Sequence, residues 1–156
     1  MADSIKKKLN LNTTFETREE AAEFVREYCA FYDQLWSPTT KWTMEHFQKM
    51  NADNNQLVWQ GQATEGIEQM IEKWKPIKGA FVEVRTLGFD VETHTETMVA
   101  FTQYLLFKTF KDQETFVVQR VVVDRDDQGK VLRHVYVLEK QYGDLVMETM
   151  EAFVSV

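Results

Sequence analysis

The sequence has one cysteine, two prolines and six glycines among its 156 residues. The single cysteine, Cys29, cannot form a disulfide within the chain, and its place on an apolar helix face predicts simple packing. No apolar run approaches the roughly 20 residues that span a bilayer, and no apolar segment follows the first lysines as in a secretory signal. We therefore expect a cytoplasmic protein that has no membrane contact.

Positive charge is also scarce, because 18 Lys and Arg residues stand against 25 Asp and Glu residues, a net charge of −7. This balance argues against nucleic-acid binding, which needs a basic surface. The one basic cluster, Lys6–Lys8, falls in residues 1–14, which we expect to form a flexible, solvated segment. The three histidines are far apart and have no helical i, i+4 pairing with a second ligand, so no metal and no cofactor is expected.

The composition that is present, with 44% hydrophobic and 28% charged residues, is typical of one globular domain. Helical spacing of apolar residues predicts a long first helix, begun by a Thr17–Glu20 capping box and ended at Ser37–Pro38. Its apolar face consists of Ala21, Phe24, Val25, Tyr28, Tyr32, Leu35 and Trp36. Such a face is expected to pack against a sheet.

Two shorter helices are expected next. The first starts near Thr40 and ends at the Asn/Asp-rich stretch 51–55, and a short strand, Leu57–Trp59, follows it. The second has Thr64 as its N-cap and Pro76 beyond its end. Their buried sides consist of Met44, Phe47 and Met50 in one helix and Ile67, Met70, Ile71 and Trp74 in the other.

From residue 81 onward the period changes from helical to strand-like. Strands are expected at Phe81–Val91, Thr97–Phe110, Thr115–Asp124 and Val131–Glu139. Asp126–Gly129 predicts a hairpin loop, and a last helix is expected at Asp144–Phe153, after Gly143. Its apolar side consists of Leu145, Val146, Met150 and Phe153. Helices first and an antiparallel meander afterwards predict an α+β fold, a curved antiparallel sheet with helices on one face.

The last hairpin predicts which side chains face the helices. A four-residue loop at 126–129 pairs Arg125 with Lys130 and Val121 with His134, and side chains alternate along each strand. The uncharged face consists of Val117, Gln119, Val121, Val123, Leu132, His134, Tyr136 and Leu138. The opposite face consists of Val118, Arg120, Val122, Asp124, Val131, Arg133, Val135, Val137 and Glu139. The helices are expected to cover the first face, and a bulge in the loop would exchange the two faces.

The second face is too apolar to remain in water, because it combines valines with opposite charges. We therefore expect a homodimer through this side of the sheet. The interface would be formed by Arg120, Val122, Arg133, Val135 and Val137.

The glycine-containing link Gly61–Gly66 raises the question of a phosphate site. It lacks the Gly-Lys-Ser/Thr ending of a phosphate loop and the three glycines of a dinucleotide fingerprint. The elements after it are antiparallel in character rather than βαβ. We therefore interpret the link as a tight strand-to-helix corner.

Two segments suggest a family. Leu57–Gly61, followed by Gly66–Ile67 and an amphipathic helix, resembles the corresponding part of nuclear transport factor 2-like proteins. The stretch Asp127–Glu139 resembles the "D-G-K-I…R…Y…D" ending of SnoaL-like members of that superfamily. The resemblance covers residues 15–142 and leaves 143–156 as a C-terminal helix or tail. It implies a cone-shaped fold, with a curved sheet wrapped around a long N-terminal helix and a pocket at the wide end, and dimers through the convex sheet face.

A helix held against a curved sheet leaves a mostly apolar hollow with few polar groups. The predicted pocket residues are Tyr28, Tyr32 and Trp36 from the first helix, Trp59 from the short strand, and Phe101, Gln103, Leu105, Phe107, Gln119, His134 and Tyr136 from the sheet. Such a pocket fits a small, flat, apolar organic ligand.

Three residues are candidates for catalysis. His134 is the candidate general acid or base, and the alternative is a core histidine bonded to Tyr136, Gln119 or backbone. Tyr32 could donate to a developing oxyanion, and the alternative is a core tyrosine whose hydroxyl is bonded internally. Asp33 points about a quarter-turn away from Tyr32, toward a solvated rim. The resemblance favours it, because a Tyr-Asp pair on this helix occurs in dehydratase members, which also use two pocket histidines.

Two functions follow from these residues. The first is a small-molecule pocket protein of the SnoaL-like type, an isomerase, cyclase or dehydratase, or a binder without catalysis. The alternative is a protein-binding adaptor resembling nuclear transport factor 2, whose pocket mouth receives an aromatic side chain of a small GTPase beside acidic groups. Asp112 and Glu114 would supply that charge, whereas Gln60 stands where an acidic rim residue is expected.

Overall fold

The computed structural model describes residues 13–155, so the predictions for Lys6–Lys8 and for residues 1–12 lie outside the described part. The elements are α2 (Arg18–Leu35), α3 (Met44–Gln48), β1 (Asn51–Trp59), β2 (Gln62–Glu65), α4 (Gly66–Ala80), β3 (Phe81–His94), β4 (Met98–Thr109), β5 (Glu114–Arg125), β6 (Val131–Leu138) and α5 (Lys140–Val154). The first helix and the later strands β3 to β6 are confirmed, with strand ends within three residues of those predicted.

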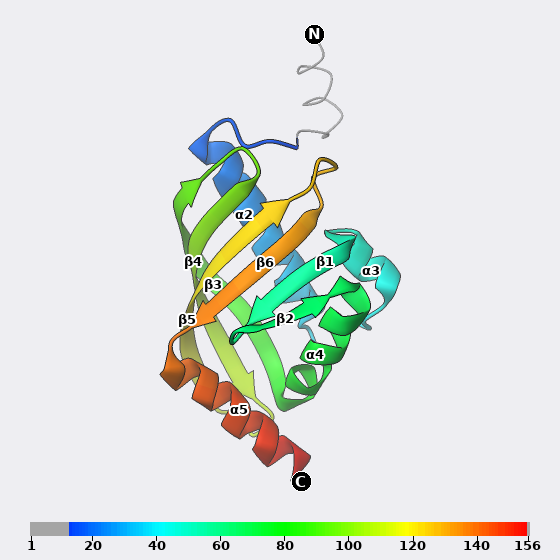
Figure 1. The fold of residues 1–156 in the computed structure, drawn as a ribbon. Coiled ribbons are helices and arrows are strands. Elements are labelled where there is room, and N and C mark those ends of the chain that lie inside the picture. The colour runs from blue at the N-terminus through cyan, green and yellow to red at the C-terminus, as the bar shows by residue number, and fades with distance from the viewer. Residues whose placement is uncertain (1–12, 156) are drawn as a thin grey trace.

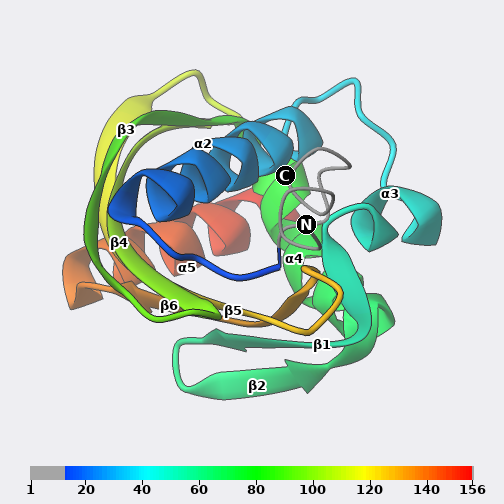
Figure 2. The ribbon, with the colours of Figure 1, turned by 90° about the horizontal axis from the view of Figure 1, so that it is seen from above.

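The strands form one sheet in the order β2-β1-β6-β5-β4-β3. Strand β1 runs parallel to β6, and the other neighbouring pairs are antiparallel. The sheet is strongly curved and does not close into a barrel, and α2 lies along its concave side (Figures 1 and 2). The predicted α+β architecture, a curved sheet around a long N-terminal helix, is therefore confirmed.

Helix α2 begins and ends as its sequence predicts. The side chain of Thr17 accepts a hydrogen bond from the backbone N–H of Glu20, and the Glu20 carboxylate accepts one from the backbone N–H of Glu16. The helix ends at Leu35, before Pro38. Its buried face is Ala21, Phe24, Val25, Tyr28, Cys29, Tyr32 and Leu35.

The last turn of α2 contains no basic residue of its own. A lysine from another helix caps its C-terminal end instead. The ammonium group of Lys78 on α4 donates to the carbonyl oxygens of Leu35, at 3.1 Å, and Ser37, at 3.0 Å. It also lies 4.9 Å from the ring centre of Trp42. A cation here satisfies carbonyl groups and complements the helix dipole.

We expect Lys78→Met to lower the free energy of unfolding by about 1–2 kcal/mol, because two charged hydrogen bonds and the dipole interaction are lost. Urea unfolding followed by fluorescence measures this difference. Lys75→Met, at an exposed position of the same helix, is the matched control and should change the stability by no more than about 0.5 kcal/mol. Equal losses in the two variants would contradict the capping role.

The segment before β1 differs from the expectation. Helix α3 has only five residues and buries only Phe47, while Met44 is 44% exposed. The stretch 51–55, predicted as a helix end, is instead the beginning of β1. The reason is a tertiary contact: Asn55 is buried, and its amide donates to the backbone carbonyl of Val131, 76 residues away. A local asparagine-rich pattern cannot reveal such a partner.

Helix α4 also differs at both ends. It begins at Gly66 with Glu65 in the N-cap position, so Thr64 is not its cap. Pro76 lies inside the helix, which continues to Ala80. Burial of Ile77 and Ala80 in the core outweighs the hydrogen bond that a proline removes.

The glycine-containing link is a hairpin followed by a helix start rather than a single corner. Gln60 and Gly61 both have positive φ, 51° and 75°, and form a two-residue turn that pairs Trp59 with Gln62. Gly66, with φ of 86°, then begins α4. The short strand β2 between the turn and the helix was missing from the sequence-based prediction.

The register of the last hairpin differs by two residues from the prediction. Val121 pairs with Tyr136 rather than with His134, which pairs with Val123. Because side chains alternate with a period of two, this shift leaves the side chains of the hairpin on their predicted faces, with Val131 as the exception. His134 is fully buried and Arg120 is exposed, as the predicted alternation of side chains along the two strands requires.

One residue did change faces. A bulge places Val131 opposite Arg125, and Val131 is fully buried although we expected it on the outer face. The bulge is next to the loop at 126–129, where the carboxylate of Asp126 accepts from the backbone N–H groups of Gln128 and Lys130. Its effect is limited to the first residue of β6, so the pocket-facing positions are unchanged.

Helix α5 lies across the lower, wide end of the curved sheet, next to α4 (Figure 1). It starts at Lys140, four residues earlier than predicted, and so contains Gly143, which is buried. A β-carbon at Gly143 would lie 2.6 Å from the side-chain nitrogen of Gln60, so glycine allows this close approach. Val146 is buried, whereas Phe153 is 39% exposed. Within residues 13–155, no helix is long and apolar enough to cross a membrane.

Candidate functional site

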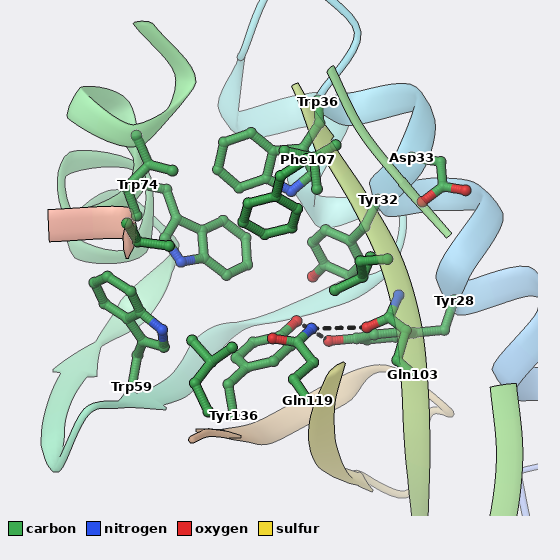
Figure 3. A pocket seen from close by; sticks show the side chains of 15 residues that line it. Tyr28, Tyr32, Asp33, Trp36, Trp59, Trp74, Gln103, Phe107, Gln119 and Tyr136 are labelled. Atoms are coloured by element: carbon green, nitrogen blue, oxygen red, sulfur yellow. Dashed lines mark hydrogen bonds between the residues drawn. The ribbon is translucent and has the colours of Figure 1, made fainter. Parts of the chain in front are cut away.

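A cavity lies between α2, the concave face of the sheet, α4 and α5 (Figure 3). It is lined by Tyr28, Tyr32, Asp33, Trp36, Trp59, Trp74, Ile77, Val84, Gln103, Leu105, Phe107, Gln119, Tyr136, Leu138 and Val146. The empty space is about 640 Å³, part of it open to solvent, and the centre of a water molecule can occupy about 70 Å³ of it. At roughly 10–15 Å³ per water, this corresponds to about five to seven waters, which is the space of a small ligand.

Aromatic side chains form a large part of the cavity wall. The ring centres of Tyr32 and Trp74 are 5.6 Å apart and the rings stand at 89° to each other. Trp36 lies 5.6 Å and Tyr136 6.0 Å from Trp74. These edge-to-face and tilted contacts place rings from α2, α4 and β6 around one space, which suits a flat apolar molecule.

Most of the predicted pocket residues line this cavity, and their binding roles remain predictions. Phe101 does not line it, because it is fully buried against Tyr28, 5.9 Å away between ring centres. Sequence reasoning missed Trp74, Ile77, Val84 and Val146 as pocket residues. Trp74 was assigned to the buried side of its helix, but no sequence signal indicated that this side faces a cavity.

His134 also lies behind the cavity wall rather than in it. Its ring has no solvent exposure, and Nδ1 lies 2.9 Å from the Tyr28 hydroxyl while Nε2 lies 3.1 Å from Oδ1 of Asn55. Burial lowers the pKa of His134 to about 3, so the ring is neutral near pH 7. This environment does not support the predicted acid–base role and matches the alternative of a hydrogen-bonded core histidine.

Tyr32 lines the cavity, but its hydroxyl proton already has a partner. The hydroxyl donates to Oδ1 of Asn51 over 3.0 Å. The amide nitrogen of Asn51 donates to the carbonyl of Phe47, which fixes Oδ1 as the group facing Tyr32. Burial raises the pKa of Tyr32 well above 10.0. A donor role toward a substrate oxyanion is not supported by this geometry.

Asp33 is the carboxylate that the cavity contains. It is half-buried rather than solvated at a rim, and its Oδ1 accepts from the backbone N–H of Thr86, at 3.0 Å, and from the Thr86 hydroxyl, at 2.7 Å. Among the described residues, none donates to Oδ2. Burial raises the pKa of Asp33 above 3.8, and the two Thr86 hydrogen bonds act in the opposite direction. An oriented carboxylate with one free oxygen can accept and return a proton.

A chain of amides leads away from Asp33 across β3, β4 and β5. Nε2 of Gln119 donates to Oε1 of Gln103 over 2.7 Å (Figure 3). Nε2 of Gln103 in turn donates to the Thr86 hydroxyl over 2.7 Å. The same nitrogen lies 3.5 Å from the sulfur of Cys29. Burial raises the pKa of the Cys29 thiol to about 12, so this thiol is a packing group and not a nucleophile.

The histidines do not assemble into a common site. His46 packs against Phe31 and His94 against Phe15, so neither joins His134 behind the cavity. The pair of pocket histidines found in dehydratase members therefore has no counterpart here. Across the part of the chain that the structure describes, no group of three or more His, Cys, Asp or Glu side chains is placed to hold a metal ion.

Similarity to known proteins is found in structure rather than in sequence. No protein-family model and no curated protein matches this chain. An NTF2-like protein from Anabaena variabilis superposes with a TM-score of 0.64 at 14% identity, covering 81% of this chain and 94% of the other. A candidate polyketide cyclase from Xanthomonas campestris gives 0.64 at 12% identity, covering 85% and 98%.

A candidate SnoaL-like polyketide cyclase from Jannaschia sp. gives a TM-score of 0.62 at 17% identity, covering 78% of this chain and 89% of the other. Identities this low establish a shared fold but no shared activity. This chain therefore has the nuclear transport factor 2-like fold.

Proposed function

We propose that the protein binds a small, flat, largely apolar organic molecule in the cavity and moves protons on it through Asp33. The aromatic lining supplies apolar contact area, and the polar groups are confined to a few positions on the wall. Isomerisation, cyclisation and dehydration of the SnoaL-like type each require a proton to be removed and another to be delivered. A single carboxyl group that accepts one proton and then donates one suits such reactions.

The observation that carries this proposal is the environment of Asp33. Thr86 holds one oxygen of the carboxylate with two hydrogen bonds, which fixes the orientation of the group, and Asp33 is one of the residues that line the cavity. The other oxygen has no protein partner among the described residues and remains for a ligand. Burial raises the pKa, which makes the carboxylate a stronger base than an exposed aspartate.

The test uses 2-indanone, a flat ketone with acidic α-hydrogens, incubated with the protein in D₂O. The carboxylate removes an α-proton and the same carbon then takes up deuterium, so mass spectrometry measures exchange above the buffer rate. Quenching of tryptophan fluorescence measures binding in parallel. Val84→Phe, which fills part of the cavity, should abolish both signals. If wild-type protein neither binds the ketone nor speeds its exchange, the proposal fails.

A second candidate function is a protein-binding adaptor. Its support is the acidic turn between β4 and β5, where Asp112 and Glu114 are exposed near the contact of Phe110 with Phe153, 5.2 Å between ring centres. An aromatic side chain of a partner would meet apolar and acidic groups there. Pull-down from lysate with wild type and with Asp112→Lys combined with Glu114→Lys tests this function, and equal recovery of partners would argue against it.

We also propose a homodimer through the convex sheet face, the face on which the alternation of side chains places the valines and opposite charges. Phe116 is 69%, Val137 57% and Tyr104 39% exposed on this side, which leaves apolar side chains in water in the isolated chain. The exposed Arg120 pairs with Glu92 beside them. A second copy of the same face would cover these groups, with the valines Val122 and Val135 and the basic Arg133 contributing.

Val137→Glu is expected to weaken this dimer at least about tenfold, because a buried interface position would receive an unpaired charge. Analytical ultracentrifugation at several concentrations measures the dissociation constant. Val154→Glu introduces the same charge at a 77% exposed position on α5 and should leave the constant unchanged. A monomeric wild-type protein at all concentrations would rule the dimer out.

A cytoplasmic location belongs to the same proposal. Its support is the free and buried Cys29, which fits a reducing compartment. Fluorescence microscopy of a tagged full-length chain in its own cell would show where the protein resides.

A further inference from the structure

The buried polar groups behind the cavity form a hydrogen-bond chain whose direction can be deduced, starting at Asn55. The side-chain nitrogen of Asn55 lies 2.8 Å from the backbone carbonyl of Val131 and 3.1 Å from Oδ1 of Asn51. A backbone carbonyl only accepts hydrogen bonds, so the NH₂ group of Asn55 must face it. The other atom of the amide, Oδ1, therefore faces His134.

This orientation fixes the tautomer of His134. Nε2 lies 3.1 Å from Oδ1 of Asn55 and 3.2 Å from the sulfur of Met70, and both of these atoms are acceptors. Nε2 must therefore carry the proton of the neutral ring. Nδ1 then has a lone pair and no proton, so it requires a donor in this fully buried place.

Two hydroxyl groups can supply that donor, Tyr28 at 2.9 Å and Tyr136 at 3.5 Å. The two hydroxyls also contact each other. In one arrangement Tyr136 donates to Tyr28, which donates to Nδ1. In the other, Tyr136 donates to Nδ1 and accepts from Tyr28. The Tyr136 proton points into the protein in both cases.

The remaining arrangement turns the Tyr136 proton toward the cavity, and the contacts exclude it. If Tyr28 then donated to Nδ1, the hydroxyl oxygens of Tyr28 and Tyr136 would be in contact with no proton between them, and their lone pairs would repel each other. If Tyr28 donated to Tyr136 instead, Nδ1 would be a buried acceptor without a donor. Tyr136 lines the cavity, and a ligand group that reaches its hydroxyl oxygen therefore meets a lone pair rather than a proton (Figure 3).

The amide chain on the neighbouring wall ends in the same way. The Thr86 hydroxyl donates to Asp33, so it accepts from Nε2 of Gln103, and Oε1 of Gln103 accepts from Nε2 of Gln119. Within residues 13–155, this direction leaves Oε1 of Gln119 without a donor and able to accept from a ligand in the cavity. Tyr136 and Gln119 thus both present acceptor oxygens.

We propose that His134 is a positioning residue that makes Tyr136 a hydrogen-bond acceptor, so the cavity selects flat ligands that bring a hydroxyl or N–H donor to Tyr136. This inference rests on the proposed binding function and adds the polarity of the ligand to it. A ring hydroxyl, as in a phenol or an enol, meets the requirement, whereas a hydrocarbon of the same shape does not. The direction of the buried chain is set by the backbone carbonyl of Val131 and does not depend on the ligand.

The experiment compares phenol with toluene, which have nearly the same size and differ in one donor. Dissociation constants are measured by tryptophan fluorescence for wild type, Tyr136→Phe and Tyr104→Phe, the last being a control on the convex face. The ratio of the toluene constant to the phenol constant should fall about three- to tenfold in Tyr136→Phe and stay unchanged in the control. The ¹⁵N signals of His134 in the wild-type protein should show a protonated Nε2 and an unprotonated Nδ1.

The outcomes separate the two proposals. If neither probe binds to wild type, the binding function itself fails. If both bind and the ratio is the same in wild type and Tyr136→Phe, the function stands and the acceptor role of Tyr136 is overturned. A His134 ring protonated at Nδ1 also overturns it, and this measurement needs no variant, so a poorly folded Tyr136→Phe does not block the test.

Discussion

Between pH 6.5 and pH 4 the protein is expected to lose about 1.4 kcal/mol of unfolding free energy per pH unit through His134 alone. The folded-state pKa of His134 is about 3 and its ordinary value is 6.5, so in this window the unfolded chain binds a proton that the folded chain does not. Acid therefore favours the unfolded state, and this contribution is complete at neutral pH and disappears as the pH falls toward 3. The raised pKa of Asp33 acts oppositely, because the folded state takes up that proton first.

Urea unfolding at pH 7, 6, 5 and 4.5 measures this pH dependence in wild type, His134→Gln and His46→Gln. The glutamine at position 134 has a donor and an acceptor but does not titrate, so this variant starts less stable and loses less on acidification. His46→Gln alters a histidine outside the core and should follow the wild type. If the free energy of unfolding changed with pH by the same amount in wild type and His134→Gln, burial would not depress the pKa of His134.

Asp33→Asn is expected to lower the rate of α-proton exchange on 2-indanone by about 10²- to 10⁴-fold, because the amide can neither take up nor return the proton. Binding of the ketone should change little, since asparagine has nearly the same shape and can still accept from Thr86. The exchange rate of wild type should rise with pH as the carboxyl group ionises, with a midpoint above 3.8 because burial raises the pKa of Asp33.

Asp90→Asn is the matched control for this prediction, because Asp90 is an exposed aspartate that accepts from the Tyr104 hydroxyl on the outer face. The Asp90→Asn variant should catalyse exchange of the α-protons of 2-indanone at the wild-type rate. Retention of more than a tenth of the rate in Asp33→Asn, with binding intact, would mean that another group moves the proton.

The pocket-facing sides of the sheet could be predicted from the sequence because the period of two in a strand is a local property. Val121 and His134 were paired two residues out of register, yet both point inward as expected. A register shift of two residues leaves each side chain on the same face of the sheet, so the wrong loop register did not change which residues face the pocket. The capping box of α2 was predictable for the same reason, since Thr17 and Glu20 are three residues apart.

The identity of the acid–base candidate was not predictable in this way. His134 and Asp33 carry the right chemistry in the sequence, but their roles depend on partners far along the chain. Asn55 lies 79 residues from His134 and holds it inside the core, and Thr86 lies 53 residues from Asp33 and holds it at the cavity. The sequence pattern placed the histidine correctly on the inner face but could not show that a layer of tyrosines separates it from the ligand space.

The sequence by itself determined the long capped helix, the strands that follow it, the uncharged inner face and the α+β class, because each follows from spacing within a few residues. Only the tertiary structure decided that the asparagine-rich stretch 51–55 joins the sheet, that Asp33 faces the cavity, and that His134 is neutral and enclosed. These outcomes depend on desolvation and on hydrogen bonds between residues distant in sequence, and both arise only when the curved sheet closes around α2.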